Sequence, residues 1–125
     1  MSTGCRFQDK RILIVDDDPD VLELFSLALS SEGAEVSTAS DGDEAIAMLM
    51  RSNPHLIVLD MMLPRRSGFL VFERIQEETD APPVLMVTAN EGRRHKTYAE
   101  NLGVGAYLTK PVAMERLFDE VEKLL

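Results

Sequence analysis

The chain has 125 residues, and its 22 acidic residues against 13 basic ones give a formal net charge of −9. This length is typical of one domain with its own core, and the negative charge argues against nucleic-acid binding by this chain alone. No run is apolar enough to span a membrane, residues 1–10 lack the hydrophobic stretch of a signal peptide, and the single cysteine, Cys5, excludes an intrachain disulfide. We therefore expect a cytoplasmic protein without membrane contact.

Short apolar runs alternate along the chain with segments of helical spacing. The first helix is well marked, because proline suits the first helical position and Pro19 follows a capping residue, Asp18. The final segment is also clear, with apolar residues at helical spacing up to Leu125. The predicted strands are residues 11–15, 35–39, 56–59, 83–87 and 106–109, and the predicted helices are residues 19 to about 33, 42–51, 69–78, 93–102 and 114–125.

Apart from residues 35–39, where Val36 is the only large apolar residue, the predicted strands are almost continuously apolar, which is typical of a parallel sheet covered on both faces. A strand followed by a helix occurs five times in succession along residues 10–125. This order predicts an α/β fold, a (βα)5 open three-layer sandwich around a five-stranded parallel sheet. Residues 1–9 are expected to be an N-terminal extension of this domain.

Polar side chains follow the predicted strands at the points where the strands end. Asp16 and Asp17 follow the first strand, Asp60 the third, Thr88 the fourth and Lys110 the fifth. Sites in open parallel sheets form beyond the carboxyl ends of the strands. We therefore expect three carboxylates, a hydroxyl and an ammonium group to lie close together at one edge of the sheet.

Three neighbouring carboxylates repel one another unless a cation lies between them. Oxygen ligands without a nearby histidine or cysteine favour Mg²⁺, with Mn²⁺ as a substitute. A carboxylate such as Asp60 can also act as a nucleophile and form an acyl phosphate. Phosphoryl transfer then requires the phosphoryl oxygens to be neutralised, which the metal at Asp17, the Lys110 ammonium and the Thr88 hydroxyl can do.

Four motifs in this order resemble the response-regulator receiver domains of bacterial two-component signalling, including the single-domain chemotaxis receivers. They are residues 13–19 (LIVDDDP), residues 59–64 (LDMMLP) with Gly68, residues 87–89 (VTA) and residues 107–111 (YLTKP). The resemblance covers essentially the whole chain. It implies a flavodoxin-like fold with strand order 2-1-3-4-5.

The resemblance also implies a site and a partner. Asp60 would receive a phosphoryl group from a sensor histidine kinase or a histidine phosphotransfer protein. Mg²⁺ would be bound by Asp17, Asp60 and the backbone carbonyl of Met62, with Asp16 acting largely through water. The protein would be a phosphoacceptor switch that catalyses only its own phosphorylation and dephosphorylation.

In such a switch, Lys110 would contact the phosphoryl group, and its peptide bond to Pro111 would be cis. Thr88 would move toward the phosphate, and Tyr107 would turn inward in response, although a packing role for this tyrosine is the alternative. The face formed by residues 93–102, the fifth strand and the final helix would then act on a downstream effector protein or a C-terminal output domain. The family also allows a dimer that forms on phosphorylation through this face.

Two other functions fit parts of the pattern. A phosphatase of the haloacid-dehalogenase type would use Asp16 as its nucleophile and Asp18 as its acid and base, but Asp20 stands where such enzymes usually carry Thr or Val. A receiver-like module that never takes phosphate is the second alternative, and the complete set of strand-end residues counts against it.

Several further residues lie outside this set of site residues. Arg65 and Arg66 depart from the common family pattern, and Met62 and Asn90 occupy positions that vary across the family. The basic run at residues 93–96 is either a solvated helix face or a partner-binding surface. His55 and His95 are expected to be exposed and to bind no metal, because neither has a partner at metal-ligand spacing.

Overall fold

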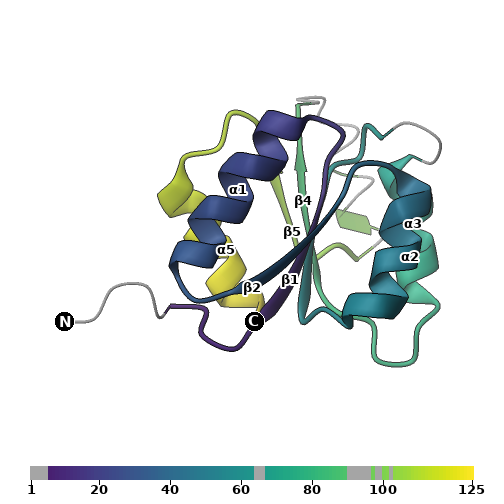
Figure 1. Cartoon of the computed structure of the whole chain (residues 1–125). Helices are drawn as coiled ribbons and strands as arrows, with labels where there is room; N and C mark the ends of the chain where they lie inside the picture. Colours follow the sequence, from purple (N-terminus) through teal and green to yellow (C-terminus); the bar gives the residue numbers. More distant parts are fainter. Residues whose placement is uncertain (1–5, 64–66, 90–96, 98–99, 102) are drawn as a thin grey trace.

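The computed structural model describes residues 6–63, 67–89, 97, 100–101 and 103–125 (Figure 1). Strands and helices alternate from β1 to β4, and β5 is followed by a helix, as predicted. The strands are Arg11–Val15 (β1), Glu35–Ala39 (β2), Leu56–Leu59 (β3), Val84–Thr88 (β4) and Ala106–Thr109 (β5). The helices are Pro19–Ser31 (α1), Gly42–Ser52 (α2), Gly68–Gln76 (α3) and Met114–Leu124 (α5). The helix predicted at 93–102 lies largely outside the described residues.

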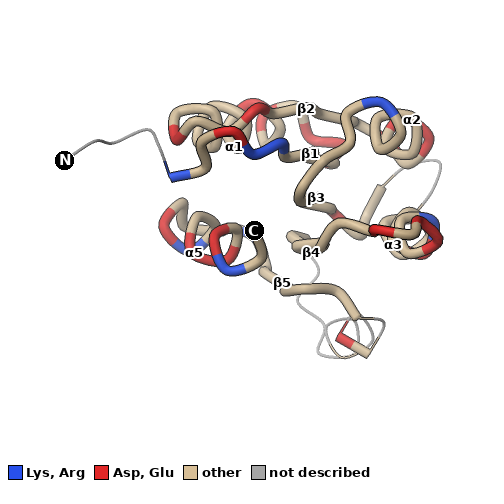
Figure 2. Tube along the Cα trace, turned by 90° about the horizontal axis from the view of Figure 1, so that it is seen from below, with Lys and Arg blue, Asp and Glu red and all other residues tan. Residues whose placement is uncertain are grey.

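The five strands are all parallel and lie in the order β2-β1-β3-β4-β5. Figure 2, seen along the strands from below, shows α1 and α5 on one side of the sheet and α2 and α3 on the other. The predicted three-layer sandwich and its strand order are therefore confirmed. None of the described helices is long and apolar enough to cross a membrane.

Each face of the sheet has its own hydrophobic core, because successive residues of a strand point to opposite faces. Ile12 and Ile14 of β1 pack with residues of α1 and α5, whereas Leu13 and Val15 pack with residues of α2 and α3. All four β1 side chains are thus buried. This arrangement explains why the strands read as continuous apolar runs in the sequence.

Five described elements, namely α1, α2, α3, β4 and α5, differ by one or two residues from their predicted ranges, and two of these differences have a clear local cause. The strand β4 begins at Val84 because Pro83 has no N–H to donate to the sheet. It extends to Thr88, which pairs in register with Thr109 of β5. The helix α3 begins at Gly68 because the Ser67 side chain accepts a hydrogen bond from the Leu70 N–H and caps the helix.

The segment before β1 contributes directly to the core. Phe7 is only 1% exposed and belongs to the cluster formed with α1 and α5. Its N–H donates to the Glu32 carbonyl at 2.8 Å, and its ring meets the Phe118 ring edge-on with centroids 5.7 Å apart. Arg6 forms ion pairs with three acidic residues of α5, namely Glu115, Asp119 and Glu122.

Candidate functional site

The sheet fixes the backbone of the residues that follow its strands. The Asp16 N–H donates to the Ala39 carbonyl at 3.1 Å, and the Asp60 N–H donates to the Val15 carbonyl at 3.0 Å. These bonds continue the pairing pattern one residue beyond β1 and β3. Both aspartates therefore start from rigid positions, and their side chains are only 4% and 6% exposed.

Lys110 joins the two buried aspartates. Its Nζ lies 2.5 Å from Asp16 Oδ2 and 3.3 Å from Asp60 Oδ2. The Lys110 N–H donates to the Thr88 carbonyl at 2.8 Å, which holds this residue beside the end of β4. The Lys110–Pro111 peptide bond is cis, as the resemblance implied.

Burial and pairing act in opposite directions on these charged groups. Burial raises the pKa of Asp16, while hydrogen bonds from Lys110 and from the Asp18 N–H partly oppose this rise. For Lys110, burial alone would lower the pKa, but the hydrogen bond to Asp16 and the negative charge of Asp60 outweigh it, so that the pKa is raised. Lys110 is therefore a cation at neutral pH that compensates buried carboxylates.

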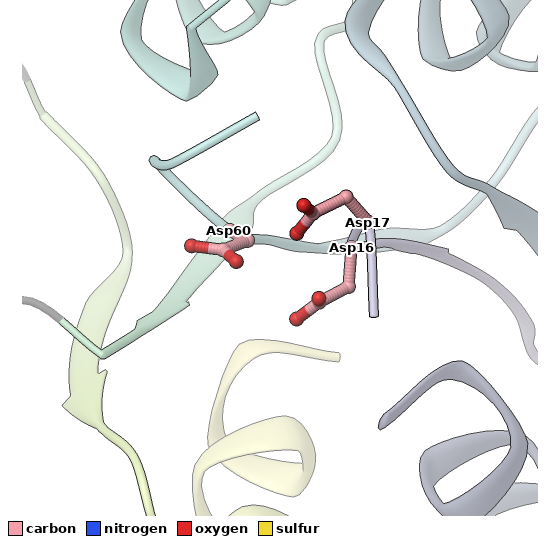
Figure 3. A group of neighbouring side chains, drawn as sticks. All are labelled: Asp16, Asp17 and Asp60. Carbon is pink, nitrogen blue, oxygen red and sulfur yellow. The ribbon is translucent and has the colours of Figure 1, made fainter. Parts of the chain in front are cut away.

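Three carboxylates surround one space at the carboxyl ends of β1 and β3 (Figure 3). Oxygen atoms of Asp16, Asp17 and Asp60 all lie within 4.8 Å of one another, and Asp17 is the exposed member. The donor set consists of hard oxygen atoms with one open side, which is the chemistry that Mg²⁺ prefers. The residues predicted as metal ligands thus meet in a group that fits this ion.

The loop after Asp60 holds the orientation of its carboxylate. The Met62 N–H donates to Asp60 Oδ1 at 3.0 Å, while the Met62 side chain is 58% exposed beside the site. Asp60 Oδ1 and Oδ2 thus contact the loop and Lys110 respectively. Met62, predicted to supply a carbonyl ligand, lies in this same loop.

Thr88 and Tyr107 lie on the two strands beyond β3. Thr88 is fully buried as the last residue of β4, and Tyr107 is half-buried in the edge strand β5. The Tyr107 hydroxyl donates to the Met61 sulfur at 3.4 Å, so the ring points inward in this structure. Burial, followed by the negative charge of Asp60, raises the Tyr107 pKa.

Gly68 is a site residue whose role the sequence indicated only as part of a motif. A Cβ at this position would lie 2.3 Å from Met61 Cα and 2.4 Å from the Asp60 carbonyl oxygen. The first turn of α3 can therefore contact the Asp60 loop only with a glycine at this position. A single glycine nine residues after the end of a strand carries no sequence signal for such a contact.

His55 has a structural role that the sequence analysis missed. It was expected to be an exposed bystander, but it is half-buried, and its Nδ1 accepts a hydrogen bond from the Arg11 N–H at 2.9 Å. Its own N–H donates to the Arg11 carbonyl at 2.7 Å. Burial and the nearby positive charge of Arg11 lower the His55 pKa. The predictions for Arg65, Arg66, Asn90 and residues 93–96, including His95, concern positions outside the described residues.

An apolar groove adjoins the site on the side of Lys110. It is lined by residues of α1 and of the loop that follows β5, namely Val21, Leu24, Phe25, Lys110, Pro111 and Val112. Leu24 is 53% exposed and contributes apolar surface to this groove. The groove therefore offers apolar surface directly beside the buried carboxylates.

Comparison with protein families gives a match over residues 12–122 to the response regulator receiver domain. Among curated proteins, the chain is 37% identical over 118 residues to the probable transcriptional regulatory protein TcrX of Mycobacterium tuberculosis, covering 94% of this chain and 50% of that protein. It is 41% identical over 117 residues to the transcriptional regulator RpaA of a Synechocystis species, covering 92% of this chain and 48% of that protein. The chain thus spans about half the length of these relatives.

Solved structures show the same architecture. A CheY-like receiver domain protein from Methanospirillum hungatei matches with a TM-score of 0.86 at 31% identity, covering 91% of both chains. The response regulator TrrA from Thermotoga maritima, solved in complex with Mg²⁺ and BeF, matches with a TM-score of 0.84 at 32% identity, covering 93% of this chain and 99% of that chain.

Proposed function

Because the chain belongs to the response regulator receiver domain family of two-component systems, we propose that it is a switch operated by phosphorylation of Asp60. The observation that carries this proposal is the position of Lys110, whose ammonium bonds to both Asp16 and Asp60. An ammonium group beside the phosphoacceptor can neutralise negative charge on the transferred phosphoryl group. Asp60 combines this pairing with a position at the open end of the sheet.

The acidic group fits Mg²⁺, which would be held by Asp17, Asp60 and the backbone carbonyl of Met62, with Asp16 acting largely through water. When bound, the ion would neutralise negative charge on the transferring phosphoryl group. Mn²⁺, which shares the preference for oxygen ligands, would substitute. The solved TrrA complex with Mg²⁺ and BeF supports this assignment by analogy.

In the proposed reaction, an Asp60 carboxylate oxygen attacks the phosphorus of a phosphohistidine. A P–O bond forms, the P–N bond breaks, and the imidazole leaves with the electron pair and later takes a proton. Lys110, already within 3.3 Å of Asp60, would neutralise one phosphoryl oxygen, and the Thr88 hydroxyl would approach another. The chain's own residues thus supply the nucleophile and the charge compensation.

The phosphodonor would be a sensor histidine kinase or a histidine phosphotransfer protein in the cytoplasm. Such a donor must bring its histidine to Asp60, and the apolar groove beside Lys110 provides a contact surface next to this path. The signal would leave through β5, α5 and the predicted helix at 93–102. Its recipient would be an effector protein or a C-terminal output domain, as in the longer transcriptional regulators.

The alternative of a phosphatase that uses Asp16 and Asp18 is not favoured. Asp18 Oδ1 accepts a hydrogen bond from the Asp20 N–H at 2.9 Å and caps α1, so this carboxylate already serves the helix. Both Asp16 oxygens accept hydrogen bonds, from the Asp18 N–H at 2.9 Å and from Lys110 at 2.5 Å, whereas Lys110 lies 3.3 Å from Asp60. If Asp60 is the phosphoacceptor, Asp18 can continue to cap α1 and Asp16 can remain paired with Lys110.

Incubation with acetyl phosphate and Mg²⁺, followed by mass spectrometry of the intact protein and its peptides, tests the proposal. We expect one phosphoryl group on Asp60, no labelling of Asp60→Asn, and strongly reduced labelling of Asp17→Asn. Asp20→Asn, an exposed acid on α1, serves as the matched control and should label normally. Label on Asp16 would instead support the phosphatase, and a wild-type protein that takes no label would refute the proposal.

A further inference from the structure

The residue after the phosphoacceptor contacts the tyrosine of the edge strand. Met61 is 3% exposed and lies in the core between the sheet and the helices α2 and α3. The Tyr107 ring packs against this same core, and its hydroxyl reaches the Met61 sulfur at 3.4 Å. Met61 and Tyr107 are separated by 46 positions in the sequence, so the contact joins β5 directly to the loop after β3.

The backbone of Met61 is held at the phosphoacceptor loop. Its carbonyl accepts a hydrogen bond from the Gly68 N–H at 2.8 Å, and its two chain neighbours, Asp60 and Met62, are joined by the bond from the Met62 N–H to Asp60 Oδ1. The Asp60 carboxylate is therefore linked by a hydrogen bond to the backbone next to Met61, whose thioether contacts the Tyr107 hydroxyl.

We propose that Met61 is a positioning residue that holds Tyr107 inward and couples the Asp60 loop to β5. This inference rests on the proposed function and assigns it a specific mechanical link. A thioether sulfur is a weak hydrogen-bond acceptor on a flexible side chain. The bond can therefore break and re-form at small cost, which suits an element with two arrangements of similar free energy.

A hydrophobic residue of similar size removes the sulfur while preserving the packing, so Met61→Leu tests the link. The chain has no tryptophan, and its tyrosines are Tyr98 and Tyr107, so tyrosine emission in a Tyr98→Phe background reports on Tyr107 alone. Beryllofluoride with Mg²⁺ is the probe. Its affinity is measured by isothermal titration calorimetry in every variant, and Tyr107 emission is recorded in the variants that retain this tyrosine. Met48→Leu, a methionine of α2 that packs against the same core, is the matched control.

We expect Met61→Leu to alter the resting emission of Tyr107 and to weaken beryllofluoride binding roughly two- to tenfold, the range of one weak contact to sulfur. Met48→Leu should bind as the wild type does. In a Tyr107→Phe background, Met61→Leu should no longer change the affinity, because the hydroxyl that it acts through is absent. A purely structural role of Met61 would instead lower the affinity equally in both backgrounds and would overturn the inference.

The outcomes separate this inference from the function on which it rests. If the wild type binds beryllofluoride and Met61→Leu gives the same emission and affinity, the coupling role is wrong and the phosphoacceptor role stands. If the wild type shows no binding at all, the proposed function fails and the coupling role fails with it. Circular dichroism of each variant establishes that the fold is retained. Tyr107→Phe removes the hydroxyl partner of the same contact and is therefore a second test of it.

Discussion

Removal of the Phe7 ring should destabilise the whole domain, although this residue precedes the first strand. Phe→Ala substitutions in protein cores cost about 3–5 kcal/mol, of which edge-to-face contacts such as that with Phe118 account for about 0.5–1.5 kcal/mol. Phe7 is 1% exposed, but it lies on a short segment that can relax into the space left behind. We therefore expect a loss of about 3 kcal/mol in the free energy of unfolding, the lower end of that range.

Urea unfolding followed by circular dichroism measures this loss. For an m value of about 2 kcal/mol/M, the midpoint of Phe7→Ala should fall by about 1.5 M without a change in slope. Gln8→Ala is the control, because Gln8 is the exposed neighbour of Phe7 and should leave the midpoint unchanged. If Phe7→Ala unfolds at the same urea concentration as Gln8→Ala, residues 6–9 do not belong to the cooperative unit and the reasoning is wrong.

Two further substitutions test contacts described above. Gly68→Ala should push the Asp60 loop away from α3. We expect it to lower the free energy of unfolding by about 1–3 kcal/mol and to slow phosphorylation by acetyl phosphate. Wild-type stability and labelling would contradict the close contact. His55 has a folded pKa below its usual value of 6.5, so the unfolded chain takes up the proton first. Stability should therefore be complete above pH 6.5 and fall as the pH drops through the folded pKa, as urea midpoints between about pH 8 and pH 5 would show. His55→Asn has no imidazole to protonate, so this variant should not lose stability between pH 6.5 and about pH 5. If the variant loses as much stability as the wild type, the loss belongs to other titratable groups.

The fold could be predicted from the sequence because its signals are local. Each buried strand is a continuous apolar run, and α1 begins at Pro19 after a capping aspartate. Phe7 could not be placed in this way, since a single apolar residue between polar neighbours has no periodicity. Its burial depends on the end of α1 and on α5, which only the folded chain brings beside it. We propose that the domain begins at Arg6, whose side chain pairs with α5.

The candidate site was predictable in its membership but not in its contacts. The carboxyl ends of parallel strands meet at one edge, so Asp16, Asp60 and Lys110 had to lie near one another. The closer approach of Lys110 to Asp16 than to Asp60 depends on side-chain positions that no spacing encodes. The bond from Tyr107 to Met61 likewise depends on the path of a loop between two elements.

The lysine bridge has a consequence for which ions the site accepts. Counted at their formal charges, three carboxylates and one ammonium group give the pocket a total of −2. One divalent ion would bring this total to zero, whereas a monovalent ion would leave a negative excess and a trivalent ion a positive one. Because uncompensated charge is costly in a partly buried pocket, we expect the pocket to favour divalent ions. Lys110 would then influence the preferred valence without being a ligand of the ion.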